Sequence, residues 1–84
     1  MNIDESRKYL EEIISLRLDS HNYEDFEMED KLRALTEKIL QKKSLLNLLI
    51  IKTTTDSIVL KFDIEDEIKR RVEDATKNYD WWNI

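Results

Sequence analysis

Apolar side chains in the first half of the chain recur at the three- and four-residue spacing of a helix that buries one face. Residues 4–18 predict a first helix, whose apolar face is Leu10, Ile13, Ile14 and Leu18. Residues 22–43 predict a second helix, whose apolar face is Met28, Leu32, Leu35 and Ile39. The polar run 19–22 between them is typical of a turn. Asn22, with Asp25 three residues later, resembles the start of a capped helix.

After Leu45 the chain changes to the alternation and the β-branched residues that favour strands. Residues 57–64 alternate, with Ile58, Leu60, Phe62 and Ile64 on one face. Residues 46–53 predict a partner strand, joined to the first through 54–56, and together they predict a β-hairpin. The alternative is that the second helix continues through Leu49, because Leu46 and Leu49 extend its apolar spacing.

The last helix is predicted from one apolar stripe along four turns, formed by Ile64, Ile68, Val72, Ala75 and Tyr79. Asp63 precedes this stripe and is a plausible N-cap. The order of elements is therefore helix, helix, strand, strand, helix. This order predicts an α+β fold (ααββα) and, at 84 residues, a single domain over residues 1–84.

The predicted hairpin carries more apolar surface than one sheet face can bury. Its first strand places Leu46, Leu48 and Ile50 on one face and further apolar side chains on the other. A lone two-stranded hairpin is marginally stable, so we expect a homodimer built around it. Trp81 and Trp82 near the end of the sequence are candidate interface anchors. The alternative is that one of the two rings packs on the core and the other lies at the surface.

Composition excludes most catalytic classes. The chain has no Cys, Gly or Pro, and His21 is its one histidine. Disulfides, zinc–thiolate sites and glycine-rich phosphate loops are therefore ruled out, and we expect no enzyme, no metal and no cofactor. No apolar run is long enough to span a membrane, and the first residues lack the basic and apolar regions of a signal peptide. We therefore expect a cytoplasmic protein, in the host cytoplasm if it is viral.

The net charge of −5 is unevenly distributed. Residues 1–31 carry a balance of −6, residues 32–61 of +4 and residues 62–84 of −3. The densest acidic cluster lies among Tyr23, Phe26 and Met28 and comprises Glu24, Asp25, Glu27, Glu29 and Asp30. It has two interpretations: acids matched to the dipole of a helix's first turn, or carboxylates presented like DNA phosphates beside apolar contact area.

A second acidic cluster comprises Asp63, Glu65, Asp66 and Glu67. Several of these acids have a basic residue four positions later, which indicates a solvated, self-neutralised helix rather than a metal site. The basic residues Lys31, Lys38 and Lys42 share one face of the second helix. They are not interleaved with aromatic residues, so we do not expect direct nucleic-acid binding.

A short, acidic chain without Gly or Pro that carries these two clusters resembles the small host-takeover proteins of bacteriophages, some of which are DNA mimics. The resemblance implies an inhibitor that occupies the basic nucleic-acid-binding surface of a host protein. Candidate targets are a histone-like nucleoid protein such as HU, a nuclease, or the transcription machinery. The alternative is a structural or regulatory oligomer, such as an antitoxin or assembly adaptor, that uses the apolar hairpin and the Trp tail as its interface.

Overall fold

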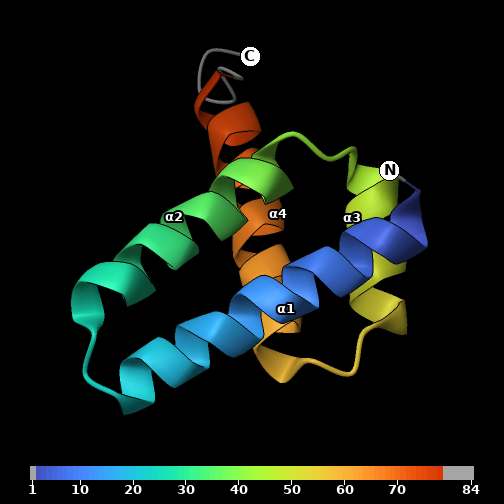
Figure 1. Cartoon of the computed structure of the whole chain (residues 1–84). Helices are drawn as coiled ribbons and strands as arrows, with labels where there is room; N and C mark the ends of the chain where they lie inside the picture. Colours follow the sequence, from blue (N-terminus) through green and yellow to red (C-terminus); the bar gives the residue numbers. More distant parts are fainter. Residues whose placement is uncertain (1, 79–84) are drawn as a thin grey trace.

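The computed structural model describes residues 2–78, which form four helices joined by short connections (Figure 1). The helices are α1 (Ile3–Asn22), α2 (Phe26–Gln41), α3 (Leu45–Thr54) and α4 (Ile58–Asn78). α1 and α2 form an antiparallel pair, α4 crosses behind both, and α3 lies beside the first turns of α1 (Figure 1). Within the described residues, no helix is long and apolar enough to cross a membrane.

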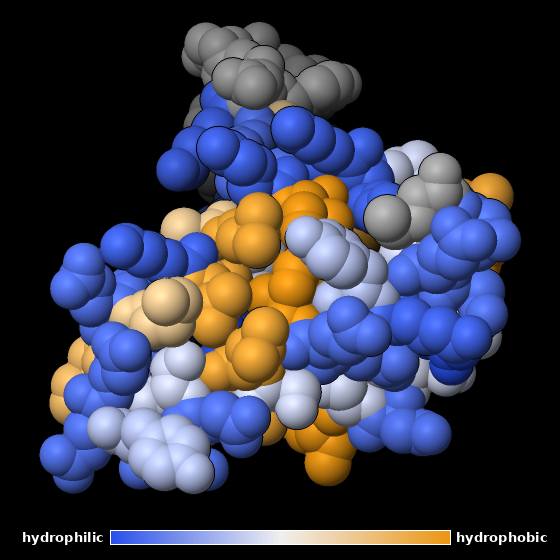
Figure 2. Space-filling model, viewed as in Figure 1, coloured by the Kyte–Doolittle hydropathy of each residue, from blue (hydrophilic) through white to orange (hydrophobic). Residues whose placement is uncertain are grey.

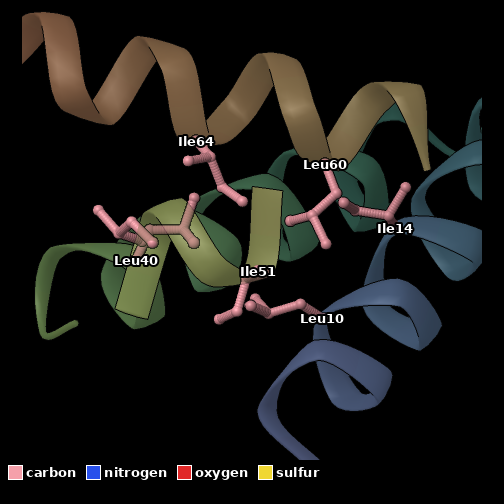
Figure 3. Packing of buried hydrophobic residues seen from close by; sticks show 7 residues of the cluster. Leu10, Ile14, Leu40, Ile51, Leu60 and Ile64 are labelled. Carbon is pink, nitrogen blue, oxygen red and sulfur yellow. The ribbon is translucent and has the colours of Figure 1, made fainter. Parts of the chain in front are cut away.

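All four helices contribute to one hydrophobic core. The buried cluster consists of Leu10, Ile14, Leu40, Leu48, Ile51, Leu60 and Ile64 (Figure 3). Within α1, α3 and α4 its members are three or four residues apart, which is the spacing that keeps them on one face. In α2 the buried residues are Thr36 and Leu40, so its buried face is rotated from the one predicted. Figure 2 accordingly shows apolar side chains at the surface where α1 and α2 pass over α4.

The predicted β-hairpin, and with it the α+β class, is wrong: residues 45–54 and 58–78 are helical, and no strand occurs within residues 2–78. A run with an apolar residue at every second position also fits a helix. In such a run each apolar residue has another one four positions later, on the same face of a helix. Leu60 and Ile64 are such a pair and are buried, whereas Ile58 and Phe62 form the other pair and are exposed. Tertiary packing of the first pair outweighs the strand preference of the β-branched residues.

The strand face proposed as a dimer platform is wrong for the same reason. Leu46 and Leu48 would share a face in a strand, but on α3 they diverge: Leu46 is 67% exposed and Leu48 is fully buried. The alternative of one continuous second helix is also wrong, because α2 ends at Gln41. A new helix begins after Ser44, whose hydroxyl accepts a hydrogen bond from the Asn47 N–H at 3.2 Å.

Some helix boundaries differ from the predicted ones. They differ where a side chain caps a turn that lies earlier or later than the predicted end. α1 continues through the polar run to Asn22. α4 begins at Ile58, where the Ser57 hydroxyl accepts a hydrogen bond from the Leu60 N–H at 3.2 Å, as an N-cap does. The prediction of Asp63 as the N-cap is therefore wrong, since Asp63 lies inside α4.

Polar side chains of α1 tie this helix to the second half of the chain. Arg17 forms a largely buried ion pair with Asp63 of α4 at 2.5 Å. Glu11 accepts a hydrogen bond at 2.6 Å from the hydroxyl of Thr55, a buried residue between α3 and α4. Arg7 donates to the carbonyl of Thr54 at the end of α3 at 3.2 Å. These contacts position α3 and α4 against α1.

Candidate functional site

The main acidic cluster lies where the chain turns from α1 into α2, a segment that we call the α1–α2 corner (residues 21–30). The Glu24 N–H donates to the His21 carbonyl at 3.0 Å, and the Asp25 N–H donates to the Ser20 carbonyl at 2.8 Å. This pair of bonds is the Schellman motif, in which the residue after the C-cap has a positive φ. Glu24 has a φ of 59°, so this chain without glycine uses a glutamate at a position that glycine usually fills.

Asp25 closes the corner from the other side as the N-cap of α2. Its side chain accepts a hydrogen bond from the Met28 N–H at 3.2 Å, and its carbonyl accepts one from the Glu29 N–H at 3.0 Å. The prediction that Asn22 caps this helix is wrong, because Asn22 still belongs to α1. The first interpretation of the cluster, acids matched to a helix start, is thus observed for Asp25.

A polar contact spans the two helices at this corner. The His21 Nδ1 lies 2.7 Å from Oε2 of Glu29, an ion pair whenever the imidazole is protonated. Glu29 Oε1 lies 4.0 Å from Arg33, and the glutamate side chain is only 14% exposed. The His21 ring also packs edge-on against Phe26, with centroids 5.9 Å apart. Glu29 is therefore engaged within the fold and offers little to a partner.

The outward surface of the corner combines aromatic and acidic side chains. Tyr23 is 85% exposed, and Phe26 and Met28 are exposed beside it. Glu24, Glu27 and Asp30 are exposed as well, and Glu27 forms a salt bridge at 3.3 Å with the exposed Lys31. We call Tyr23, Glu24, Phe26, Glu27, Met28 and Asp30 the corner patch. Asp25 is exposed as well but caps α2, so the patch contains the acids of the corner that form no cap and are exposed.

The second acidic cluster does not form a comparable surface. Asp63 is paired with Arg17, and Glu65 is paired with Lys52 of α3 at 3.0 Å. Glu67 is buried and holds two arginines of its own helix, Arg70 at 3.3 Å and Arg71 at 2.7 Å. Asp66 is exposed. The helical pair predicted between Glu67 and Arg71 is present, but the partner of Glu65 comes from a different helix.

The apolar residues predicted as an interface are separated by the helical structure. Leu46 is exposed, Ile50 is half-buried and Leu48 belongs to the core. Trp81 and Trp82 lie outside the described residues. In their place the structure exposes Ile58, Phe62 and Val72 along α4, residues to which the predicted hairpin and stripe assigned buried positions. Phe62 follows Ile58 by four residues, and Val72 follows Phe62 by ten. This spacing is the signal in the sequence that places the three on one side of a helix.

Over residues 2–78 there is no pocket and no grouping of His, Asp and Glu residues that could hold a metal ion. No protein-family model, curated protein or solved structure matches the chain. Its function is therefore argued from the corner patch and from the exposed face of α4.

Proposed function

We propose that this protein is a non-catalytic inhibitor whose corner patch occupies the basic, nucleic-acid-binding surface of another protein. The observation that carries the proposal is Tyr23, which is 85% exposed beside Glu24 at the most exposed turn of an acidic segment. Tyrosine is among the residues that contribute most to binding when an interface buries them. Exposed carboxylates around it repel nucleic acid and attract basic protein surfaces.

The rigidity of the corner supports this proposal. The Schellman motif and the Asp25 cap determine the backbone on both sides of Tyr23, and the contact between His21 and Glu29 joins the two helices. A surface that is ordered before binding loses less conformational entropy when it binds. The backbone positions from which Glu24, Glu27 and Asp30 extend are therefore ordered before binding, which favours mimicry of a regularly spaced phosphate backbone.

The geometry also narrows the set of acids that would act. Asp25 caps α2, Glu29 is engaged by His21, and three of the four acids in the second cluster form ion pairs. Glu27 also pairs with Lys31, but its side chain is 83% exposed, and Asp66 lies away from the corner on α4. The mimicry is therefore assigned to Glu24, Glu27 and Asp30, the acids of the corner patch. The resemblance to phage DNA mimics, the cytoplasmic location and the candidate targets, which are a nucleoid protein, a nuclease or the transcription machinery, all belong to this proposal. The lack of cysteine is consistent with a reducing compartment.

Affinity capture tests the proposal with a matched pair of variants. The corner variant carries Glu24→Lys, Glu27→Lys and Asp30→Lys, and it leaves the Asp25 cap intact. The control variant carries Glu12→Lys, Glu73→Lys and Asp74→Lys, which are exposed acids elsewhere and change the net charge equally. We expect the wild type and the control to capture nucleic-acid-binding proteins from a bacterial lysate at low salt, and to lose them at high salt.

The corner variant should capture none of these proteins. The proposal is wrong if the corner variant captures the same proteins as the control, or if the captured proteins do not bind nucleic acid. Circular dichroism of both variants checks that the fold is retained.

The second candidate function, a structural or regulatory oligomer, is favoured by one observation. Three leucines of α3, Leu45, Leu46 and Leu49, are exposed, and so are Ile58, Phe62 and Val72 of α4. An association through these side chains would persist at high salt, because burial of apolar surface depends little on ionic strength. Salt therefore separates the two candidates in the same capture experiment.

A further inference from the structure

The face of α4 that points away from the core carries a stripe of side chains at regular spacing. We call it the α4 seam: Ile58, Phe62, Glu65, Lys69, Val72 and Thr76. Its members are alternately four and three residues apart and span about 27 Å of helix. Leu60 and Ile64 point from the same helix into the core (Figure 3), so the seam lies on the opposite side.

The apolar members of the α4 seam are open to solvent. Ile58 is 66% exposed, Phe62 is 60% exposed and Val72 is 60% exposed. Single exposed apolar side chains are ordinary, but here they share a stripe whose four-three spacing matches that of helices that pair along their length. At the edge of the stripe, Lys52 of α3 forms an ion pair with Glu65 at 3.0 Å.

The two charged residues of the seam determine how a second copy fits. In a parallel, in-register pair each residue faces itself, so Glu65 faces Glu65 and Lys69 faces Lys69, which is repulsive at both levels. In an antiparallel pair whose two-fold axis crosses the seam midway between Glu65 and Lys69, Glu65 faces Lys69 of the second copy. The same register places Phe62 against Val72.

Other antiparallel registers lose this match. A shift of one heptad in one direction places Phe62 against Glu65 of the second copy, and a shift in the other direction places Lys69 against Val72. In the antiparallel register centred at the level of Glu67 along the helix, apolar residues face apolar residues and the acid faces the base. The two-fold axis makes each of these contacts occur twice. The seam carries one acid and one base and is neutral, whereas the whole chain carries −5. Copies of this chain therefore repel each other less at the seam than elsewhere.

We propose that this protein forms a two-fold homodimer by antiparallel pairing of the α4 seam, with Phe62 against Val72 and Glu65 against Lys69 of the second copy. The pairing is isologous, as in most two-fold dimers. It differs from the dimer expected around a hairpin, because Ile58 and Phe62 contribute to it from a helix and Val72 lies beyond the predicted hairpin. It is also independent of the partner proposed for the corner patch, which lies on a different pair of helices.

Charge-reversal substitutions at Glu65 and Lys69 test this register. Lys69→Glu and Glu65→Lys each place like charges opposite one another at two positions of the dimer. We expect each variant alone to raise the dimer dissociation constant at least about tenfold, measured by sedimentation equilibrium. An equimolar mixture of the two variants should associate as a heterodimer, since each acid again faces a base. The double variant E65K/K69E should regain the wild-type affinity.

Two controls separate pairing from damage to the fold. Lys52→Ala removes the intramolecular salt bridge of Glu65 and should leave the dimer unchanged. Phe62→Gln should weaken the dimer, whereas Tyr23→Gln, which replaces a more exposed aromatic residue away from the seam, should not. The proposal is overturned if the wild type sediments as a monomer at every concentration. It is equally overturned if both single charge variants still dimerise, or if their mixture fails to associate.

Discussion

Glu67 on α4 orients the guanidinium of Arg71, one turn later on the same helix. The guanidinium caps the end of a different helix, α2. The Arg71 Nε donates to Glu67 Oε2 at 2.7 Å. The Arg71 Nη2 then donates to the carbonyls of Leu40, Gln41 and Lys43, at 3.0, 3.3 and 2.6 Å. The last carbonyls of a helix have no partner within the helix. The pair therefore satisfies the end of α2 and fastens it to α4.

Replacement of Arg71 by Ala should destabilise the fold by about 2–4 kcal/mol, because Glu67 is then left buried with a weaker partner and the end of α2 loses its donors. The free energy of unfolding is measured by urea denaturation followed by circular dichroism. Arg71→Lys should recover only part of the loss, since an ammonium group cannot bridge a carboxylate and three carbonyls as a guanidinium does.

Arg70→Ala is the matched control for this change. Arg70 also contacts Glu67, but its side chain is more exposed than that of Arg71 and reaches no carbonyl of α2. We expect a smaller loss, about 1 kcal/mol, because Glu67 keeps its shorter bond to Arg71 at 2.7 Å. Equal losses for the two arginines would show that the contact with α2 contributes nothing.

Glu24→Gly should stabilise the protein by about 0.5–1 kcal/mol. Glu24 has a φ of 59°, a conformation that costs a residue with a Cβ roughly 1–2 kcal/mol, and that glycine adopts freely. Part of the gain is offset by the greater freedom of glycine in the unfolded chain. Tyr23→Gly, at the neighbouring residue with a φ of −89°, should destabilise instead. The assigned corner geometry is wrong if both substitutions stabilise the protein, or if both destabilise it.

Leu48→Ala and Leu46→Ala distinguish a helix from a strand at residues 45–54. On α3, Leu48 is in the core and Leu46 is exposed, so the first change should cost about 2–5 kcal/mol and the second less than about 0.5 kcal/mol. In a strand the two side chains share a face and their losses would be similar. Chemical denaturation of the two variants measures the difference directly.

The ion pair between Arg17 and Asp63 should show a coupling free energy of about 1–3 kcal/mol in a double-mutant cycle with Ala at either position. Its atoms are 2.5 Å apart and both side chains are mostly buried, so water screens them little. Additive losses would mean that the two residues stabilise the fold separately. The pair between Lys31 and Glu27, which is exposed at 3.3 Å, provides a control with coupling near zero.

The first two helices could be predicted because their apolar residues follow the helical period over several turns, although the end of the first also alternates like a strand and the buried face of α2 is rotated from the predicted one. The hairpin prediction failed at Ile58–Ile64, where a two-residue alternation and a four-residue spacing coincide. The choice between them depends on which residues the rest of the chain can bury. The packing of Leu60 and Ile64 in the core that all four helices share decides for the helix, and such long-range packing cannot be inferred from a local pattern.

The candidate site likewise combines features that a local sequence pattern reveals with features that depend on the fold. The acidic segment around Glu24 was evident in the sequence, because a local run of charge is visible without a fold. That Glu29 is engaged by His21, and that Asp63 pairs with Arg17 46 residues away, depends on how the helices meet. The i, i+4 spacing of Glu67 and Arg71 was visible, but the three carbonyls that Arg71 reaches at and just after the end of α2 were not.

Competition with DNA tests the proposed function most directly. A nucleic-acid-binding protein captured by the wild type is purified and bound to a fluorescent DNA duplex, and fluorescence anisotropy is recorded as the wild type or the Glu24/Glu27/Asp30→Lys variant is added. We expect the wild type to release the duplex, and the variant to leave it bound at every concentration. Simultaneous binding of the duplex and the wild type, or equal displacement by the variant, would contradict the assignment of the corner patch as a DNA mimic.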